Sequence, residues 1–292
     1  DDFIEQLISS STHDMLLFFT NSGKVYSMKG YEVPEYGRAA QGIPIINLLG
    51  INNKEKISAV INVSHETNDD DKYLFFTTKL GTVKRTAVTE FKNIRSNGLK
   101  ALNLHENDEL IDVEVISEDQ PMIIGTHNGY ALSFKSSVVR SMGRSAAGVR
   151  GIRLRDEDYV IGAAPLNPDS KVLVISENGF GKQTPASEYP IKGRGGLGVK
   201  TVNVTAKNGP LVGLTTVNGD EDIMLVTDQG VIIRFDIESV SQTGRSAVGV
   251  HLIKMDNGAR VATIAKVDKE VDEETEEATN NSSQEESQPT EN

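Results

Sequence analysis

The hydrophobic pattern of this chain repeats five times, at intervals of about 50 residues. Each copy starts with a short apolar run that ends at a turn glycine. A segment of alternating apolar and polar residues follows, and then a loop of small residues that contains a second glycine. The turn glycines are Gly23, Gly81, Gly129, Gly179 and Gly230, and the loop glycines are Gly42, Gly98, Gly148, Gly198 and Gly249. The two glycines of a copy are 19, 17, 19, 19 and 19 residues apart, a regularity that indicates a true structural repeat.

The apolar runs predict short buried strands, because they are rich in β-branched and aromatic residues and are bounded by turns. Residues 16–19, 73–76, 122–124, 172–175 and 223–226 form these first strands, and residues 24–28, 82–86, 130–134 and 231–235 are second strands. After the loop, third strands are expected at residues 43–46, 99–102, 149–154, 199–202 and 250–254, and fourth strands at 57–63, 110–115, 160–164, 211–217 and 261–267.

Four strands per repeat of this length are typical of a propeller blade, whereas a parallel β-helix has a much shorter period. The sequence therefore predicts an all-β propeller or pinwheel of four-stranded blades over residues 1–267. The repeats span about 14–63, 72–115, 121–164, 171–217 and 222–267.

Most of the net charge of −12 comes from the C-terminal segment. Residues 268–292 contain ten acids, one lysine and almost no large apolar residues, so we expect a disordered acidic tail. The remaining body carries 32 acids and 29 bases. Its charge is nearly balanced, so the position of the bases is more informative than their number.

The small-residue loop of every copy carries an arginine three or four residues before the loop glycine. These arginines are Arg38, Arg95, Arg144, Arg194 and Arg245, and Lys92, Arg140 and Lys192 lie beside them. Equivalent positions on successive blades fall along one rim, so the pattern predicts a stripe of positive charge. Such a track is a typical nucleic-acid surface, and small residues let a phosphate approach backbone amides. The alternative is that the glycines serve strand connections and the arginines are solvated rim charges.

Other chemistry has little support in the sequence. There is no cysteine, and His13, His65, His105, His127 and His251 show no metal-ligand spacing. The segment 193–198 matches the dinucleotide-binding pattern G-x-G-x-x-G, but a strand is expected after it where that motif needs a helix. No apolar run approaches the roughly 20 residues that span a membrane. We expect no membrane association, a cytoplasmic location and no catalytic constellation.

Several segments resemble the C-terminal domain of the A subunit of bacterial DNA gyrase. They are Ser11-Thr12-His13-Asp14, the run from Gly30 to Arg38 (GYEVPEYGR), the run from Gly81 to Phe91 (GTVKRTAVTEF), Met142-Gly143-Arg144 with the run from Gly148 to Leu154 (GVRGIRL), and the run from Gly179 to Thr184 (GFGKQT). The resemblance covers residues 1 to about 267, and the acidic tail is also typical of the family.

The resemblance implies a six-bladed β-pinwheel that wraps duplex DNA around a basic perimeter. The wrap supports ATP-dependent negative supercoiling by a type II topoisomerase holoenzyme of two A and two B subunits. The partners it implies are duplex DNA, the N-terminal part of gyrase A, and gyrase B. It also implies that ATP and magnesium act elsewhere in the holoenzyme, so no cofactor is expected in this chain.

The sequence departs from the family pattern in two respects. Five copies are visible where the family has six, and the gyrase-A box is absent. Residues 192–198 resemble that box, but Leu197 stands where a base is required. We expect the first blade and the box to lie upstream of Asp1, and the disc to be open or to contain an incomplete blade.

Two other functions stay open at this stage. The chain also fits the C-terminal domain of the topoisomerase IV A subunit, which is paralogous to that of gyrase. A propeller can also serve as a protein-interaction platform whose basic loops bind an acidic partner. For the acidic tail, competition with DNA for the rim and a role in solubility are both open.

Overall fold

The computed structural model describes residues 8, 10–37, 40–64, 70–95, 97–255 and 258–268 of the chain. Residues 269–292, which make up nearly all of the predicted acidic tail, lie outside the described residues, as does Arg38.

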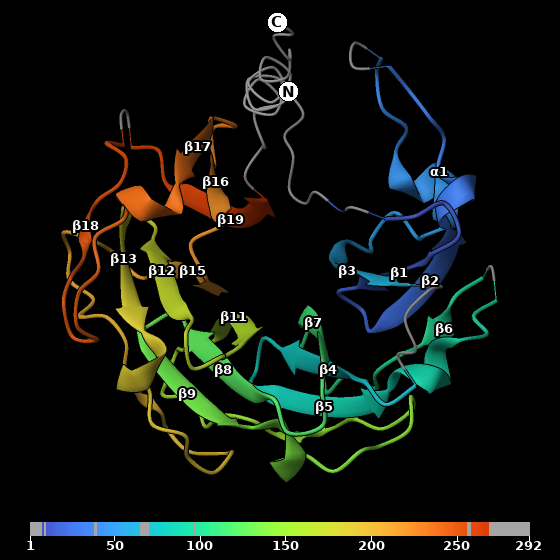
Figure 1. Ribbon diagram of the computed structural model, residues 1–292, viewed down its shortest axis with the longest axis horizontal. Helices are drawn as coiled ribbons and strands as arrows, with labels where there is room; N and C mark the ends of the chain where they lie inside the picture. The colour runs from blue at the N-terminus through green and yellow to red at the C-terminus, as the bar shows by residue number, and fades with distance from the viewer. Residues whose placement is uncertain are drawn as a thin grey trace, which may run out of the picture.

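Five antiparallel sheets stand around a common axis in an arc, which confirms the prediction of an all-β propeller (Figure 1). Each of the five repeats supplies three strands to one sheet. The sheets contain β1 (Met15–Thr20), β2 (Lys24–Lys29) and β3 (Ile57–Val63); β4 (Tyr73–Thr78), β5 (Thr82–Ala87) and β7 (Leu110–Ile116); β8 (Pro121–Thr126), β9 (Tyr130–Lys135) and β11 (Val160–Pro165); β12 (Lys171–Ser176), β13 (Phe180–Pro185) and β15 (Leu211–Val217); and β16 (Glu221–Thr227), β17 (Ile232–Asp236) and β19 (Val261–Asp268).

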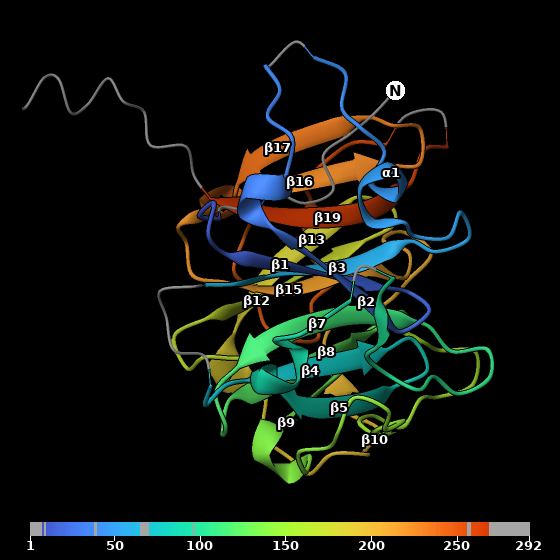
Figure 2. The ribbon, with the colours of Figure 1, turned by 90° about the vertical axis from the view of Figure 1, so that its right-hand side faces the viewer.

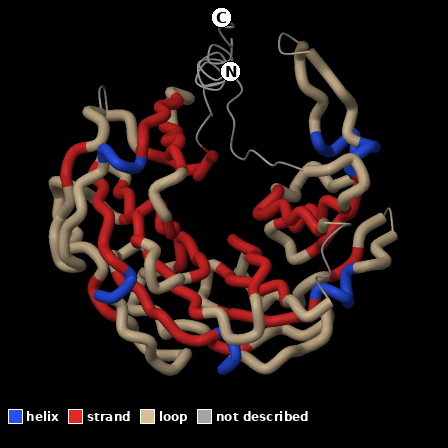
Figure 3. Tube along the Cα trace, in the orientation of Figure 1, coloured by secondary structure: helices blue, strands red, loops and turns tan. Residues whose placement is uncertain are grey.

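The strands run across the disc from one face to the other (Figure 2). β3, β7, β11, β15 and β19 lie nearest the axis, and each contacts the next along the series. Short 3₁₀ turns follow the second strands and lie at the outside of the arc (Figure 3). They are η1 (Gly30–Glu32), η2 (Val88–Phe91), η3 (Ser136–Val138), η4 (Ala186–Glu188) and η5 (Ile237–Ser239).

The third strands do not complete the sheets of their own repeats, and this corrects the expected blade. β6 (Leu99–Lys100) pairs with β2, β10 (Val149–Arg150) with β5, β14 (Val199–Lys200) with β9, and β18 (Val250–His251) with β13. Each of the first four sheets therefore takes its outermost strand from the following repeat. The fifth sheet pairs three strands in the described part of the chain, so one blade is incomplete.

Both glycines of the repeat serve this strand exchange. The carbonyls of the first four turn glycines each accept two N–H groups from the next repeat; Gly81 O, for example, accepts from Gly151 N at 2.8 Å and Ile152 N at 3.2 Å. The loop glycine lies against the backbone of the preceding blade, where a Cβ on Gly148 would come within 2.4 Å of Val83 O. Gly148 also has a φ of +94°, a conformation that glycine adopts at little cost.

The first repeat departs from the prediction. Residues 43–46 were expected to form a third strand, but α1 spans Ile45–Leu49. No sheet in the described part of the chain precedes this repeat to receive a strand. Leu49 and the nearby Ile51 instead pack with Leu16 and Phe18 and cover the outward face of the first sheet.

The hydrophobic core lies between the blades. Leu17 and Phe19 of the first sheet pack with Leu74 and Phe76 of the second, and similar clusters fill the next three junctions. The rings of Phe19 and Phe76 meet edge to face with centroids 5.5 Å apart, a favoured aromatic geometry. Because each blade buries its faces against its neighbours, the repeats form one cooperative unit.

Gly179→Ala should destabilise the protein more than Gly230→Ala. Both glycines have a φ of +79°, so alanine at either position should cost about 1–2 kcal/mol. At Gly179 a Cβ would also lie 2.5 Å from Ile253 O of the exchanged segment, whereas Gly230 has no atom within 4 Å. We expect that overlap to add about 1–3 kcal/mol to the loss of unfolding free energy in urea titrations. Equal losses would contradict the structural role assigned to the exchange.

Candidate nucleic-acid interface

The rim loops are the segments between each 3₁₀ turn and the exchanged strand. Backbone hydrogen bonds hold the loops of the third, fourth and fifth repeats along the second strand of the preceding blade. Met142 N donates to Arg85 O at 2.9 Å, Lys192 N to Ser133 O at 2.8 Å, and Thr243 N to Gln183 O at 2.9 Å. The same exchange that links the blades therefore also lays the arginine-bearing loops along the outer rim, one at each junction.

Two predicted arginines reach back to the end of the preceding exchanged strand. Arg194 Nη1 donates to Arg150 O at 3.1 Å, and Arg245 Nη1 donates to Lys200 O at 3.1 Å. Arg194 Nε also donates to Val138 O at 3.4 Å. A guanidinium has five N–H donors, so these bonds orient each group and leave donors free for a ligand. Sequence reasoning predicted the position of these arginines but not their contacts with neighbouring loops.

Arg144 is partly buried beside an acid. Its Nε lies 3.9 Å from Glu90 Oε2, on a side chain that η2 places at the rim. The backbone carbonyl of Arg144 accepts a hydrogen bond of 2.6 Å from Lys84 Nζ. Arg144 is thus fixed both through its side chain and through its main chain.

The other predicted bases differ in their surroundings. Lys92 forms a salt bridge with Asp70, which offsets its charge. Arg95, Arg140 and Lys192 are exposed on the rim loops. Arg38 lies outside the described residues, so its predicted role stays a prediction.

A second row of bases was not assigned from the sequence. Lys100, Arg150 and Lys200 end the exchanged strands β6, β10 and β14, and all three are exposed. Arg194 and Arg245 donate to the carbonyls of two of these residues, so the two rows adjoin. Each base stands two residues after a loop glycine, a regular spacing that could have revealed the row.

Two buried lysines lie beneath the rim. Lys84 and Lys182 are fully buried at equivalent positions, three residues after the turn glycines of the second and fourth repeats. Burial lowers the pKa of each ammonium to about 8, while Glu90 opposes the shift at Lys84 and Glu188 opposes it at Lys182. Both ammonium groups donate to a backbone carbonyl of the next repeat, Lys84 to Arg144 O and Lys182 to Gly244 O and Arg245 O, and Lys84 also donates to Ala101 O of its own repeat.

The loop glycines face the protein. Those of the second to fifth repeats have φ between +73° and +94°, and a Cβ on each would overlap the preceding blade. Gly42, in the first repeat, has no atom within 4 Å of its Cβ position. The segment 193–198 is followed by the strand β14, as expected, and not by a helix.

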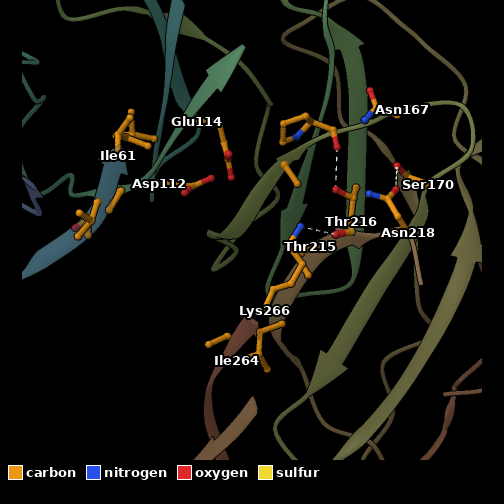
Figure 4. Close-up of a pocket in the computed structure, with 17 residues that line it drawn as sticks. Ile61, Asp112, Glu114, Asn167, Ser170, Thr215, Thr216, Asn218, Ile264 and Lys266 are labelled. Atoms are coloured by element: carbon orange, nitrogen blue, oxygen red, sulfur yellow. Dashed lines mark hydrogen bonds between the residues drawn. The ribbon is translucent and has the colours of Figure 1, made fainter. Parts of the chain in front are cut away.

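A cavity of about 460 Å³ lies on the axis and is lined by the inner strands of all five sheets (Figure 4). Asp112 and Glu114 of β7 face it from one side and Lys266 of β19 from the other. Burial, followed by the charge of Glu114, raises the pKa of Asp112 well above its ordinary value. Burial raises the pKa of Glu114 to about 7, and Lys266 opposes that shift.

These acids occur in one repeat alone. The positions equivalent to Asp112 on the other inner strands are Ala59, Gly162, Gly213 and Thr263. Within the described residues, no group of three or more His, Cys, Asp or Glu side chains is placed to hold a metal ion. In the same part of the chain no helix has the length and apolar character needed to cross a membrane. Charged side chains therefore recur from repeat to repeat at the rim, whereas the acids at the axis do not recur.

The fold and the rim define a strand-exchanged β-propeller with two adjoining rows of bases on its outer edge. The sequence matches the family described as "DNA gyrase C-terminal domain, beta-propeller" over residues 14–64, 72–117, 120–167, 170–218 and 221–268. The chain belongs to this family, and the five matched segments coincide with the five repeats.

The relatives of this chain include gyrase A subunits. The chain is 62% identical over 267 residues to the DNA gyrase A subunit of Streptococcus pneumoniae, an alignment that covers 91% of this chain and 32% of the relative. It is 58% identical over 270 residues to the DNA gyrase A subunit of Halalkalibacterium halodurans, covering 92% of this chain and again 32% of the relative. The chain thus spans about a third of the length of these relatives.

Two solved structures share the fold. The gyrase A C-terminal domain matches with a TM-score of 0.75 and 28% identity, over 88% of this chain and 83% of that one. The C-terminal domain of DNA topoisomerase IV matches with a TM-score of 0.81 and 27% identity, over 94% and 85%. The backbone therefore fits both classes of domain, and the much higher sequence identities point to gyrase.

The raised pKa of Glu114 should make stability depend on pH. A raised pKa means that folding favours the protonated acid, so this contribution is complete below the ordinary pKa of 4.5 and is lost as pH rises to about 7. Glu114→Gln keeps a neutral side chain at every pH, so its urea midpoint should fall less than that of the wild type between pH 4.5 and 8. Glu109→Gln, at an exposed site just before β7, is the control. Parallel pH profiles for Glu114→Gln and the wild type would refute the assignment.

Proposed function

We propose that this chain binds duplex DNA and wraps it around the rim, as the C-terminal domain of a DNA gyrase A protein. The observation that carries the proposal is the repeated placement of Arg144, Arg194 and Arg245 at successive junctions of an arc. The second row of Lys100, Arg150 and Lys200 widens the basic surface to two parallel tracks.

The chemistry of this surface suits phosphate and not base edges. Arginine and lysine bind the sugar–phosphate backbone by charge-assisted hydrogen bonds, which position DNA without reading its sequence. Smooth bending of a 20–30 base-pair stretch by 40–90° costs about 1–6 kcal/mol, so contacts from several blades are needed to hold a wrap. An arc of rigidly linked blades supplies such contacts at regular intervals.

The part of this proposal that concerns the whole enzyme rests on the similarity to gyrase A proteins. In the gyrase A proteins that the chain resembles, about two thirds of the length lies outside the matched region. We propose that the present domain acts with the N-terminal part of gyrase A and with gyrase B in a cytoplasmic holoenzyme. Strand cleavage, ATP hydrolysis and magnesium binding would occur in those other parts, and the wrap would direct strand passage toward negative supercoils.

Topoisomerase IV is the second candidate, favoured by the TM-score of 0.81 to its C-terminal domain. In that case the same rim would bind DNA without imposing a gyrase-like wrap. The 58–63% identities to gyrase A proteins favour the first proposal.

The double variant Arg144→Gln/Arg194→Gln should bind duplex DNA more weakly than the wild type. Each phosphate that is no longer neutralised should lower the slope of log affinity against log salt by about 0.9, so we expect a total change of about 1–2. Fluorescence anisotropy with a labelled duplex across a range of salt concentrations measures both quantities.

Lys54→Gln/Lys56→Gln is the matched control for this experiment. It removes the same charge from the exposed loop before β3, away from the exchanged rim loops. The control should keep nearly the full slope. Equal effects of the two double variants would show that DNA responds to net charge and not to the rim.

A further inference from the structure

The rim loops of the third and fifth repeats are held from beneath by charged side chains of the preceding blade. Lys182 Nζ donates to Gly244 O at 2.6 Å and to Arg245 O at 2.5 Å. From the other side, Glu188 Oε2 accepts a hydrogen bond of 2.9 Å from Arg245 N. The backbone of Arg245 is therefore held at both its N–H and its carbonyl.

A related arrangement occurs two blades earlier. Lys84 Nζ donates to Ala101 O and, at 2.6 Å, to Arg144 O. Glu90 Oε2 lies 3.9 Å from Arg144 Nε and 3.9 Å from the Cβ position of Gly143, and Glu188 Oε2 lies 3.7 Å from the corresponding position of Gly244. We call each lysine and glutamate pair a clamp; Glu188 holds the backbone N–H of Arg245, whereas Glu90 lies beside the guanidinium of Arg144.

The loop between these two has neither part of the clamp. In the third blade, Leu132 stands where Lys84 and Lys182 stand, and Val138 replaces the glutamate. The loop over that blade carries Gly193, Gly195 and Gly196 beside Arg194, and its arginine is oriented through its own guanidinium. Leu132 shows that an apolar side chain fills this buried position, so packing alone does not require a lysine there.

A buried ammonium is costly unless its hydrogen bonds are satisfied. Lys182 directs two donors to main-chain carbonyls of the segment that bears Arg245, and Lys84 directs one to the carbonyl of Arg144. We propose that Lys84 with Glu90, and Lys182 with Glu188, are positioning residues that fix Arg144 and Arg245 as two rigid phosphate anchors. Arg194 lies on the loop between these two anchors, and the backbone of that loop is held in another way, by Lys192 N donating to Ser133 O at 2.8 Å and Gly195 N donating to Gly151 O at 2.6 Å.

This inference rests on the proposed DNA-binding function and adds a positioning role for two buried lysines and two rim glutamates. Rigid anchors lower the entropy lost when an arginine engages a phosphate.

Glu188→Ala separates positioning from simple electrostatics. The substitution removes a negative charge from a basic rim, so the electric field alone predicts tighter DNA binding. Loss of the acceptor for Arg245 N predicts weaker binding, by about tenfold, with a salt slope reduced by about 0.9 for one phosphate that is no longer bound. Val138→Ala, at the equivalent exposed position of the third blade, is the matched control and should change neither quantity.

Hydrogen exchange of the amides in residues 241–248 provides a readout that needs no DNA. Lys182→Met and Glu188→Ala should both speed this exchange, whereas Leu132→Met should leave it unchanged. Unchanged exchange in Glu188→Ala would overturn the clamp, and this exposed position tests it even if Lys182→Met fails to fold. Faster exchange with DNA binding that is unchanged or tighter would overturn the anchor role.

Failure of the proposed function itself would be recognised in the wild type. If the unaltered protein showed no salt-dependent affinity for the labelled duplex, both DNA binding and the anchor role would be refuted. Faster exchange in the two variants would then identify Lys182 and Glu188 as holding the loop without a part in DNA recognition.

Discussion

The architecture depends on one close approach, that of the backbone of one repeat to the hairpin of the repeat before it. At four junctions the turn-glycine carbonyl accepts two N–H groups from the exchanged segment, and the loop glycine packs on the second strand. A side chain at either glycine would collide with the neighbouring repeat: with main-chain atoms at most of these positions, which are hard to displace, and with the ring of Tyr26 at Gly98. The two glycines without such contacts, Gly42 and Gly230, belong to the first and last repeats, where the exchange has no partner in the described part of the chain.

This constraint also builds the candidate DNA surface. A segment that must cross to the preceding blade carries its loop along the outside of the disc, so a base in the loop is placed at a junction. Arg194 and Arg245 each donate a hydrogen bond to the last residue of the preceding exchanged strand, so neighbouring segments are joined along the rim. Function and stability are thus linked, because the hydrogen bonds that join blades are also those that position the charges.

The sequence was sufficient for the repeat, the strands and the position of the rim arginines, because period, alternation and turn glycines are local signals. It did not reveal the strand exchange, because the residue pattern of a third strand is the same whether the strand pairs within its own repeat or with the preceding one. Residues 43–46 show the limit most clearly: they have the pattern of a strand but, with no sheet beside them, lead into α1. The clamps at Lys84 and Lys182 were also hidden, because a lysine in an alternating strand gives no sign that it is buried.

A rim built by strand exchange should hold DNA on a curved path, and the topology of a closed plasmid reports that path. The protein is added to relaxed circular plasmid, the complex is treated with a nicking-closing topoisomerase, and the linking-number distribution is resolved on a gel. We predict a shift toward positive supercoils that grows with the ratio of protein to DNA. An unshifted distribution, with binding retained in a mobility assay, would contradict this prediction by showing that the rim holds DNA without wrapping it.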